Sequence, residues 1–482
     1  MDREERREKR QKDTKNATLL FGGFLLIVIL LIVGVVFSAW RIIFKGNQQN
    51  TAKTEVQTQT GTQKQSETQM ETEMQTQSGI QTQTKHESKS ALKMETQIAL
   101  QTALQTVSAL HLDSIRSTAE SEVADIPVDE NVAEQAAEIV AAMSLEDKVA
   151  QMFVITPGAL TGYSSVTAAG DTTKTSYDKS PVGGIVYMSE NLIDREQAVT
   201  MLSNMQTIAQ ERTGLPLFLC VDEEGGSVAR IASNSEFGVT DVGDMSDIGA
   251  TGDAANAHEA GNTIGTYLAE IGFNVDFAPV GDVLTNAKSS VIGERSFGSD
   301  SALVSEMVNA ELQGLSEAGV YGTVKHFPGH GGVSGDSHNT IVSTDRTLEE
   351  LMEEELVPFQ GAIDTGVSFI MVGHIAAPKV TGDKKPASLS KVLVTDVLRE
   401  QMGYDGIVIT DAMNMGAITD KYNSDTAAVA AVQAGVDMIL MPANYSKAYN
   451  SVLQAVKNGK ISEERIDESV MRIVKVKLQM QQ

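Results

Sequence analysis

The chain has 482 residues, of which 41% are hydrophobic and 21% charged, which is enough for one large globular domain with accessory segments. Its 38 Lys and Arg residues are outnumbered by 64 Asp and Glu residues, and a formal charge of −26 argues against nucleic acid as a partner, because phosphate binding needs clustered cations. The single cysteine, Cys220, excludes an intrachain disulfide, a thiolate-rich zinc site and a Cys-ligated iron–sulfur cluster.

The N-terminal segment has the composition of a membrane anchor. Residues 17–40 carry no charge, and at about 1.5 Å per residue a helix of this length exceeds the roughly 30 Å hydrocarbon core. Seven cations precede the run, whereas only Arg41 and Lys45 follow it closely. A cleaved signal peptide is the alternative, but its apolar part usually has only about 7–15 residues. We therefore expect a cytoplasmic N-terminus (1–16), one transmembrane helix, and a single-pass protein of the cell membrane with its catalytic part outside the cell.

A polar linker is expected over residues 41–125. Residues 47–84 contain 10 Thr and 11 Gln among 38 residues, so they offer no apolar periodicity to bury and predict a disordered tether. The first clear helix pattern follows at residues 131–143. Ser144 with Asp147 three positions later predicts the capped start of a second helix.

Beyond the linker, short apolar runs alternate with longer helical patterns, such as those over residues 301–319 and 348–366. Continuous apolar runs are typical of parallel strands that are covered on both faces. The eight candidate strands are 152–156, 183–188, 217–221, 274–280, 323–327, 369–374, 406–410 and 437–441. Eight strands with crossover helices predict an α/β protein with a single catalytic (β/α)₈ TIM-type barrel over residues 126–482. An open doubly wound sheet is the alternative.

Polar side chains cluster where the predicted strands end, which is the active face of such a barrel. They are Asp222, Glu223, Glu224 and Arg230 after the third strand; Asp282 and the loop 293–298 after the fourth; Lys325, His326, His330, Asp336 and His338 in and after the fifth; His374 after the sixth; and Asp411 after the seventh. No comparable cluster occurs at the opposite strand ends. The asymmetry predicts an active site at this face.

General acid–base catalysis with a carboxylate nucleophile explains this cluster better than a metal site does. His326 and His330 are four residues apart, but Pro328 and Gly329 between them exclude the helical H-E-x-x-H geometry. A carboxylate two residues from a histidine in a glycine-rich loop, such as Asp336 beside His338, can orient and charge the imidazole. Asp411 would face the reacting centre from another strand. Taken singly, these residues also fit ordinary turns and helix caps.

Several segments resemble a known family. KHFPGHGGVSGDSH (325–338), VDEEGGSVAR (221–230) and GYDGIVITDAMNMGAI (403–418) are similar to glycoside hydrolase family 3, and within it to the β-N-acetylhexosaminidase (β-N-acetylglucosaminidase) branch. MSLEDKVAQMF and GERSFG match too, so the resemblance covers roughly residues 130–480.

The resemblance implies a retaining double displacement without a cofactor or metal. Asp411 matches the family's nucleophile, and Asp336 with His338 matches the acid/base dyad of the hexosaminidase branch. The implied sugar-binding residues are Asp222, Arg230, Arg295, Lys325 and His326. The expected substrate is terminal β-linked N-acetylhexosamine in cell-wall glycan fragments from peptidoglycan turnover, and the catalytic domain is expected to be monomeric.

The sequence departs from the family pattern at two points, which affect the expected charge of the site and the expected activity. Glu223 stands where Gln is frequent, which predicts a slightly altered charge at the barrel rim. The sequence shows no second α/β sandwich domain, from which family β-glucosidases take their acid/base glutamate, and this favours the hexosaminidase. A β-glucosidase or β-xylosidase, a β-N-acetylglucosaminide phosphorylase and a non-catalytic glycan receptor remain as alternatives.

Overall fold

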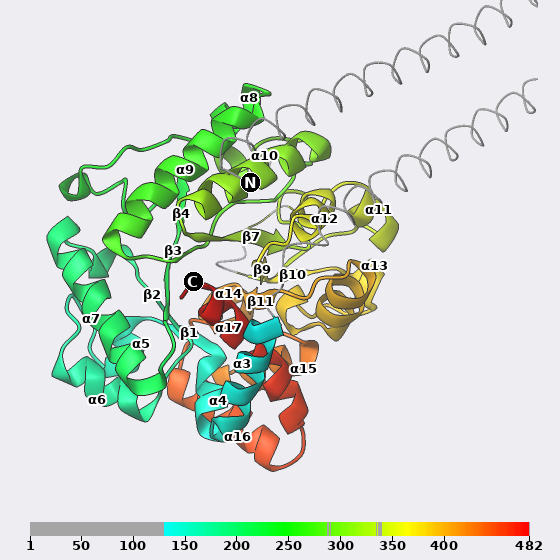
Figure 1. The fold of residues 1–482 in the computed structure, drawn as a ribbon. Helices are drawn as coiled ribbons and strands as arrows, with labels where there is room; N and C mark the ends of the chain where they lie inside the picture. Colours follow the sequence, from blue (N-terminus) through cyan, green and yellow to red (C-terminus); the bar gives the residue numbers. More distant parts are fainter. Residues whose placement is uncertain (1–129, 287–288, 290, 334, 336–339, 482) are drawn as a thin grey trace, which may run out of the picture. The chain divides into compact units, whose positions relative to one another are not determined.

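The computed structural model describes residues 130–481 apart from 287–288, 290, 334 and 336–339 (Figure 1). The expected membrane helix, the polar linker and the Asp336–His338 pair lie outside the described residues, so these remain predictions. Within the part that is described, no helix is both long and apolar enough to cross a membrane.

In the described part of the chain, a ring of eight parallel strands forms the centre of the fold (Figure 1). The strands are β1 (Phe153–Ile155), β2 (Gly184–Val186), β3 (Phe218–Val221), β6 (Val275–Asp276), β7 (Tyr321–Phe327), β9 (Phe369–Val372), β11 (Ile407–Thr410) and β12 (Ile439–Leu440). Their order is β11-β9-β7-β6-β3-β2-β1-β12. A parallel bridge between Ile409 and Met438 brings the two ends together and nearly closes the barrel.

The barrel confirms the strand predictions. Seven of the eight apolar runs contain one of these strands, and the run 323–327 forms the C-terminal part of β7. The open sheet is excluded by the bridge from Ile409 of β11 to Met438, which directly precedes β12. Apart from Tyr321 at the start of β7, every residue in the eight strands is buried. Both faces of each strand are covered, one by the packed barrel interior and one by helices, which is why the runs are apolar throughout.

Helices surround the strands (Figure 1). They are α3 (Glu130–Ala142), α4 (Leu145–Gln151), α5 (Pro157–Thr161), α6 (Asp171–Lys179), α7 (Arg195–Thr213), α8 (Met245–Ala250), α9 (Ala254–Ile271), α10 (Ser301–Glu317), α11 (Leu348–Glu353), α12 (Val357–Asp364), α13 (Pro378–Thr381), a π-helix (Val392–Gln401), α14 (Gly416–Thr419), α15 (Ser424–Ala434), α16 (Tyr445–Lys457) and α17 (Glu463–Gln479). Two short pairs lie apart from the barrel sheet: β4 (Glu223–Gly225) with β5 (Val228–Ala229), and β8 (Val342–Ser343) with β10 (Ile375–Ala376).

Helices α9 and α10 approach each other through glycines. A Cβ on Gly314 would lie 2.3 Å from the carbonyl oxygen of His258, and one on Gly261 would lie 2.3 Å from that of Glu311. Such distances are far inside van der Waals contact, so larger side chains would push the helices apart. The close packing fixes α10, which leads directly into β7.

The predicted helix over residues 348–366 is in fact two helices. Helix α11 starts with a reciprocal cap, in which Thr347 Oγ1 accepts from the Glu350 amide (3.3 Å) and Glu350 accepts from the Thr347 amide (2.7 Å). It ends at Glu353 because Pro358 has no N–H to donate to the carbonyl of Glu354, and α12 starts afresh around the proline. The predicted cap at Ser144 is confirmed, since its Oγ accepts from the Asp147 amide at 3.1 Å.

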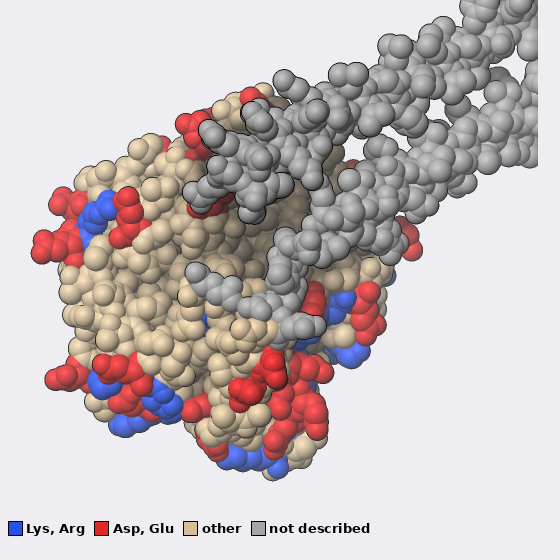
Figure 2. Space-filling model, viewed as in Figure 1, with Lys and Arg blue, Asp and Glu red and all other residues tan. Residues whose placement is uncertain are grey.

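The surface charges are mixed on the face that Figure 2 shows. Lys and Arg lie next to Asp and Glu, and the described residues on this face form no continuous basic patch. Lys457 with Glu146 (2.7 Å) and Lys174 with Glu211 (2.8 Å) are examples of such exposed pairs. Exposed pairs of this kind contribute little to stability, roughly 0–1 kcal/mol each.

Helix α17 places a lysine inside the N-terminal end of the barrel. Lys477 is buried; its Nζ donates to Gln151 Oε1 at 2.7 Å and lies 5.0 Å from the ring centroid of Phe218, the first residue of β3. Burial lowers the pKa of Lys477 from 10.5 to about 7. Because the unfolded chain binds this proton more tightly than the folded chain does, the contribution of Lys477 to stability rises with pH between these two values.

We therefore expect the change in melting temperature from about pH 7 to about pH 9 to be more positive in the unmodified protein than in Lys477→Met. Methionine keeps most of the buried volume and removes the charge. Thermal melts at several pH values, with Lys475→Met on the same helix as control, measure the effect. An equal pH dependence in Lys477→Met and the unmodified protein would contradict the assignment.

Candidate active site

The predicted sugar-binding residues of β3 and β7 meet at one end of the barrel. Asp222 follows β3, and Lys325 lies near the C-terminal end of β7. Their side chains pair across 103 residues of sequence, with Lys325 Nζ 3.0 Å from Asp222 Oδ1. Since the eight barrel strands are all parallel, Asp411 after β11 lies at the same end.

A buried glutamate binds two cations of the site, Arg295 and Lys325. Glu224 in the β4–β5 hairpin accepts from Arg295 Nε (2.7 Å) and Nη2 (2.8 Å) and also contacts Lys325 Nζ. Burial would raise the pKa of Glu224, but Lys325 and Arg295 lower it to about 2. The bidentate geometry fixes the plane of the Arg295 guanidinium. The result is a rigid charged frame in which Lys325 and Arg295 stay protonated.

Asp411 is held as an ionised carboxylate. Its amide donates to the carbonyl of Val372 at 2.9 Å, and its Oδ1 accepts from the amide of Ala412 at 2.7 Å. Burial would raise the pKa of Asp411, but His374, His326 and the Ala412 amide together lower it below its usual value. An ionised, oriented carboxylate at a barrel strand end has the properties of a nucleophile.

His374 holds the backbone next to Asp411 in place. Its side chain is fully buried, with Nδ1 2.8 Å from Ser388 Oγ and Nε2 3.0 Å from the carbonyl oxygen of Ala412. Because a carbonyl only accepts, Nε2 carries the hydrogen. His374 thus holds the carbonyl of Ala412, the residue whose amide binds Asp411, and this rim histidine is a supporting residue.

The remaining described rim histidines are also buried. His326 donates from Nδ1 to Asp282 at 2.7 Å, and its ring lies edge-on to that of His330, with centroids 5.9 Å apart. Burial lowers the pKa of His330. Among the residues that the structure describes, no group of three His, Cys, Asp or Glu side chains is arranged to hold a metal ion.

The predicted change in rim charge at Glu223 is wrong. Glu223 is fully buried and accepts from the amides of Ile231 and Ala232 and from the hydroxyl of Tyr267, each at 2.8 Å. Burial raises its pKa despite these bonds. Glu223 therefore anchors the β4–β5 hairpin, which carries Glu224 and Arg230, and places no charge at the rim.

Arg230 lies outside the ion-pair network. It directly follows β5 and forms no ion pair with any described residue, and its buried Nε has no hydrogen-bond partner among them. The predicted dyad, Asp336 and His338, lies outside the described residues. The segments on either side of it are held at the strand-end face: the Val333 amide donates to the His330 carbonyl at 3.3 Å, and β8 pairs with β10 just after β9.

Three residues of the site were noted at strand ends in the sequence, but no function was assigned to them. Glu224, Asp282 and His374 stand at predicted strand ends, and this position is the signal that marks them. Their roles depend on partners far along the chain, such as Arg295, which lies 71 residues beyond Glu224. Nothing in the local sequence names those partners.

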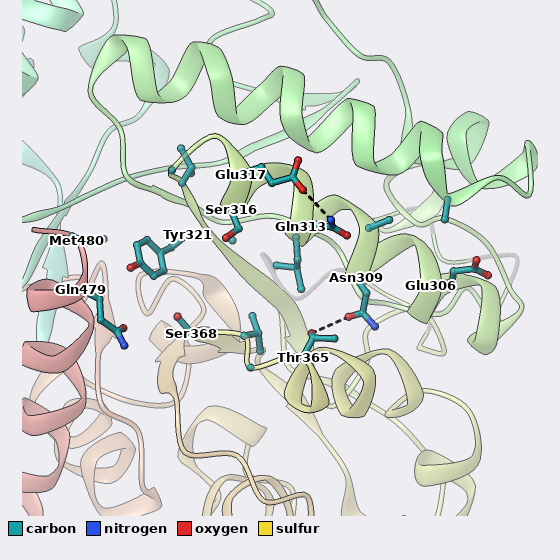
Figure 3. A pocket seen from close by; sticks show the side chains of 18 residues that line it. Glu306, Asn309, Gln313, Ser316, Glu317, Tyr321, Thr365, Ser368, Gln479 and Met480 are labelled. Carbon is teal, nitrogen blue, oxygen red and sulfur yellow. Dashed lines mark hydrogen bonds between the residues drawn. The ribbon is translucent and has the colours of Figure 1, made fainter. Parts of the chain in front are cut away.

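A hollow of about 810 Å³ lies elsewhere (Figure 3). It is lined by α10 and by residues such as Tyr321 and Ser368, which stand at the start of β7 and just before β9. Gln313 donates to Glu317 within it at 2.9 Å (Figure 3). These are the N-terminal ends of the strands, so this hollow is at the opposite end from Asp411 and is separate from the candidate active site.

Comparison with known proteins agrees with this geometry. The model of the glycosyl hydrolase family 3 N-terminal domain matches residues 144–476. A "Beta-hexosaminidase LpqI" of Mycobacterium tuberculosis is 36% identical over 375 residues, covering 73% of this chain and 87% of that protein. "Beta-hexosaminidase A" of Pseudoalteromonas piscicida is 33% identical over 326 residues, covering 62% of this chain and 54% of that protein, so the chain spans about half of that relative.

A solved structure extends the agreement to three dimensions. The family 3 β-N-acetylglucosaminidase from Paenibacillus sp. str. FPU-7 aligns with a TM-score of 0.66 and 38% identity, covering 71% of this chain and 64% of that one. The matched family domain includes all eight barrel strands and every described strand-end residue discussed above. The chain belongs to glycosyl hydrolase family 3.

Proposed function

We propose that the chain is a β-N-acetylhexosaminidase that releases terminal β-linked N-acetylglucosamine by a retaining double displacement. The observation that carries this proposal is Asp411, a carboxylate kept ionised at the end of β11 and oriented by the Ala412 amide. The names of the relatives, two beta-hexosaminidases and a β-N-acetylglucosaminidase, support the substrate class.

In the first step Asp411 attacks the anomeric carbon. Its Oδ1 is occupied by the Ala412 amide, whereas Oδ2 accepts no hydrogen bond from a described residue and is the attacking atom. The bond from the anomeric carbon to the leaving oxygen breaks as the bond to Oδ2 forms, and His338 gives its proton to the leaving oxygen.

In the second step water replaces Asp411 on the sugar. His338, now neutral, takes a proton from the water, whose oxygen bonds to the anomeric carbon while the carboxylate leaves. Asp336 orients the imidazole and favours its charged form. Two inversions at the anomeric carbon give net retention.

The charged frame would bind the sugar hydroxyls. Asp222, half-buried beside Lys325, offers carboxylate oxygens, and Lys325 and Arg295 offer oriented charged donors. Arg230 has donors that no described residue uses. His326 contributes the ring nitrogen that is not bound to Asp282.

The variant His338→Ala tests whether His338 is the acid and base of the reaction while Asp411 is the nucleophile. A natural disaccharide should lose about 10²-fold or more in turnover, because protonation of the leaving oxygen is lost. A nitrophenyl glycoside has a good leaving group, so its first step should survive better. The second step lacks its base, and a glycosyl-enzyme should accumulate as a mass increase on the Asp411 peptide.

Asp336→Asn should show a milder form of the same defect, since Asp336 transfers no proton. Equal losses on both kinds of substrate, with no trapped intermediate, would refute the acid/base assignment.

A panel of nitrophenyl glycosides separates the hexosaminidase from a β-glucosidase or β-xylosidase. Product analysis with and without phosphate separates hydrolysis from phosphorolysis.

We further propose that the domain is displayed outside the cell on a single N-terminal membrane helix and acts on cell-wall glycan fragments. The uncharged run at 17–40 and the excess of cations before it support this topology.

External protease on intact cells should then release an active fragment by cutting within residues 41–125, because an extended polar linker is readily cleaved. Activity released into the medium, with a cytoplasmic enzyme as the lysis control, is the measurement. A domain that stays protected until the cells are lysed would contradict the topology.

A further inference from the structure

Asp282 follows β6 at the strand-end face and has no role in the function proposed above. Its carboxylate is fully buried. Oδ2 accepts from His326 Nδ1 at 2.7 Å, and Oδ1 accepts from the backbone amides of His326 (3.3 Å) and His330 (2.6 Å). One side chain thus binds both the ring and the backbone of the sugar-binding histidine.

The carboxylate of Asp282 is ionised. Burial would raise its pKa, but His326, His330 and the amide of His330 lower it below its usual value. An ionised carboxylate has no hydrogen to donate, so the hydrogen between Asp282 and His326 resides on Nδ1. The other ring nitrogen, Nε2, is then the one that exchanges hydrogen bonds with a ligand.

The backbone around Asp282 joins two further segments of the site. Ser296 Oγ donates to the carbonyl of Asp282 at 2.6 Å, and Ser296 directly follows Arg295. A Cβ on Gly331 would lie 2.1 Å from the carbonyl oxygen of Val283, so the loop that follows His330 packs directly on this segment. Asp282 therefore stands where the Arg295 loop and the loop after β7 meet.

We propose that Asp282 is a positioning residue, which fixes the Nδ1–H tautomer of His326 and so presents Nε2 to a hydroxyl of the substrate. The catalytic consequence rests on the proposed glycosidase function, whereas the tautomer does not. Asp282→Asn is the sharpest test because it is isosteric. Its amide can donate to Nδ1, which moves the hydrogen of a neutral imidazole to Nε2 and removes the acceptor there.

The experiment combines spectroscopy with kinetics on the full chain. In the unmodified protein, ¹⁵N-labelled histidine should show His326 with hydrogen on Nδ1, assigned by the signal that His326→Gln loses. In Asp282→Asn the hydrogen should move to Nε2, and kcat/KM for a nitrophenyl N-acetylglucosaminide should fall about 10- to 100-fold, mainly through KM. Ser296→Ala removes the bond to the backbone carbonyl of Asp282 and the contacts with the backbone of Gly298, but no bond to the Asp282 carboxylate, so it should leave the tautomer unchanged.

Hydrogen on Nε2 of neutral His326 in the unmodified protein would overturn the proposal, and this measurement needs no variant to fold. Unchanged kcat/KM in a folded Asp282→Asn would overturn its catalytic part. Should the unmodified protein hydrolyse no glycoside, the proposed function fails, while the tautomer measurement still decides whether Asp282 sets the state of His326.

Discussion

Asp411→Asn should lower turnover roughly 10⁴-fold or more on every glycoside, natural or activated. An amide does not displace the leaving group, so the covalent intermediate cannot form. The variant keeps the shape of the side chain, and its amide oxygen still accepts from the Ala412 amide that holds Asp411 at 2.7 Å. Substrate binding should therefore change far less than turnover.

Steady-state kinetics on a nitrophenyl substrate and on a disaccharide provide the measurement, with binding followed by calorimetry. Asp420→Asn is a matched control, because Asp420 is an exposed residue nine positions further along the chain. Intact mass must exclude deamidation back to aspartate. Substantial turnover by verified Asp411→Asn would remove Asp411 from the role of nucleophile.

The barrel could be predicted from sequence because its signal is local. Each strand is a short apolar run bounded by polar residues, and the repeated alternation with helices admits few folds. The break between α11 and α12 was missed because the stretch around it keeps a helical pattern, and only Pro358 marks the change. The N-terminal cap at Ser144 was predicted because a cap is set by residues three positions apart.

The site was predictable as a set of residues but less so as an arrangement. Strand-end position identified Asp222, Lys325 and Asp411, since parallel topology brings strand ends together. It did not show that Asp282 pairs with His326, which lies 44 residues away, because pairing depends on packing between neighbouring loops. Nor did it show that Glu223 turns inward while Glu224, the next residue, binds two cations.

The two ends of the barrel hold their charged groups differently. At the C-terminal ends, Asp222 and Arg230 keep partial exposure, and in the proposed function they offer polar atoms to the sugar. At the N-terminal ends some charged side chains are paired entirely inside the fold. Asp437, which precedes β12, is the clearest case, because it is fully buried beneath helix α17.

Asp437 is bound by groups from three elements. Its Oδ1 lies 3.6 Å from Arg465 and 3.4 Å from Arg472 and accepts from Ser469 at 2.6 Å, all three on α17. Its Oδ2 contacts Arg399 of the π-helix and accepts from the amide of Val408 in β11 at 2.9 Å. One carboxylate therefore joins α17 and the π-helix to the strand at which the barrel closes.

Asp437→Ala should lower the free energy of unfolding by about 3–5 kcal/mol, because it removes the counter-ion of Arg399 and one of the two counter-ions of Arg465 and Arg472. Asp405→Ala is the matched control: Asp405 is 83% exposed and, among the described residues, forms an ion pair only with Arg472, so its loss should cost about 1 kcal/mol or less. Urea unfolding of both variants gives the two values. Turnover per folded molecule at low temperature should stay near that of the unmodified protein, since Asp437 and Asp411 lie at opposite ends of the barrel. Similar small losses in both variants would show that the three arginines find other partners, and that the closure of the barrel does not depend on this carboxylate.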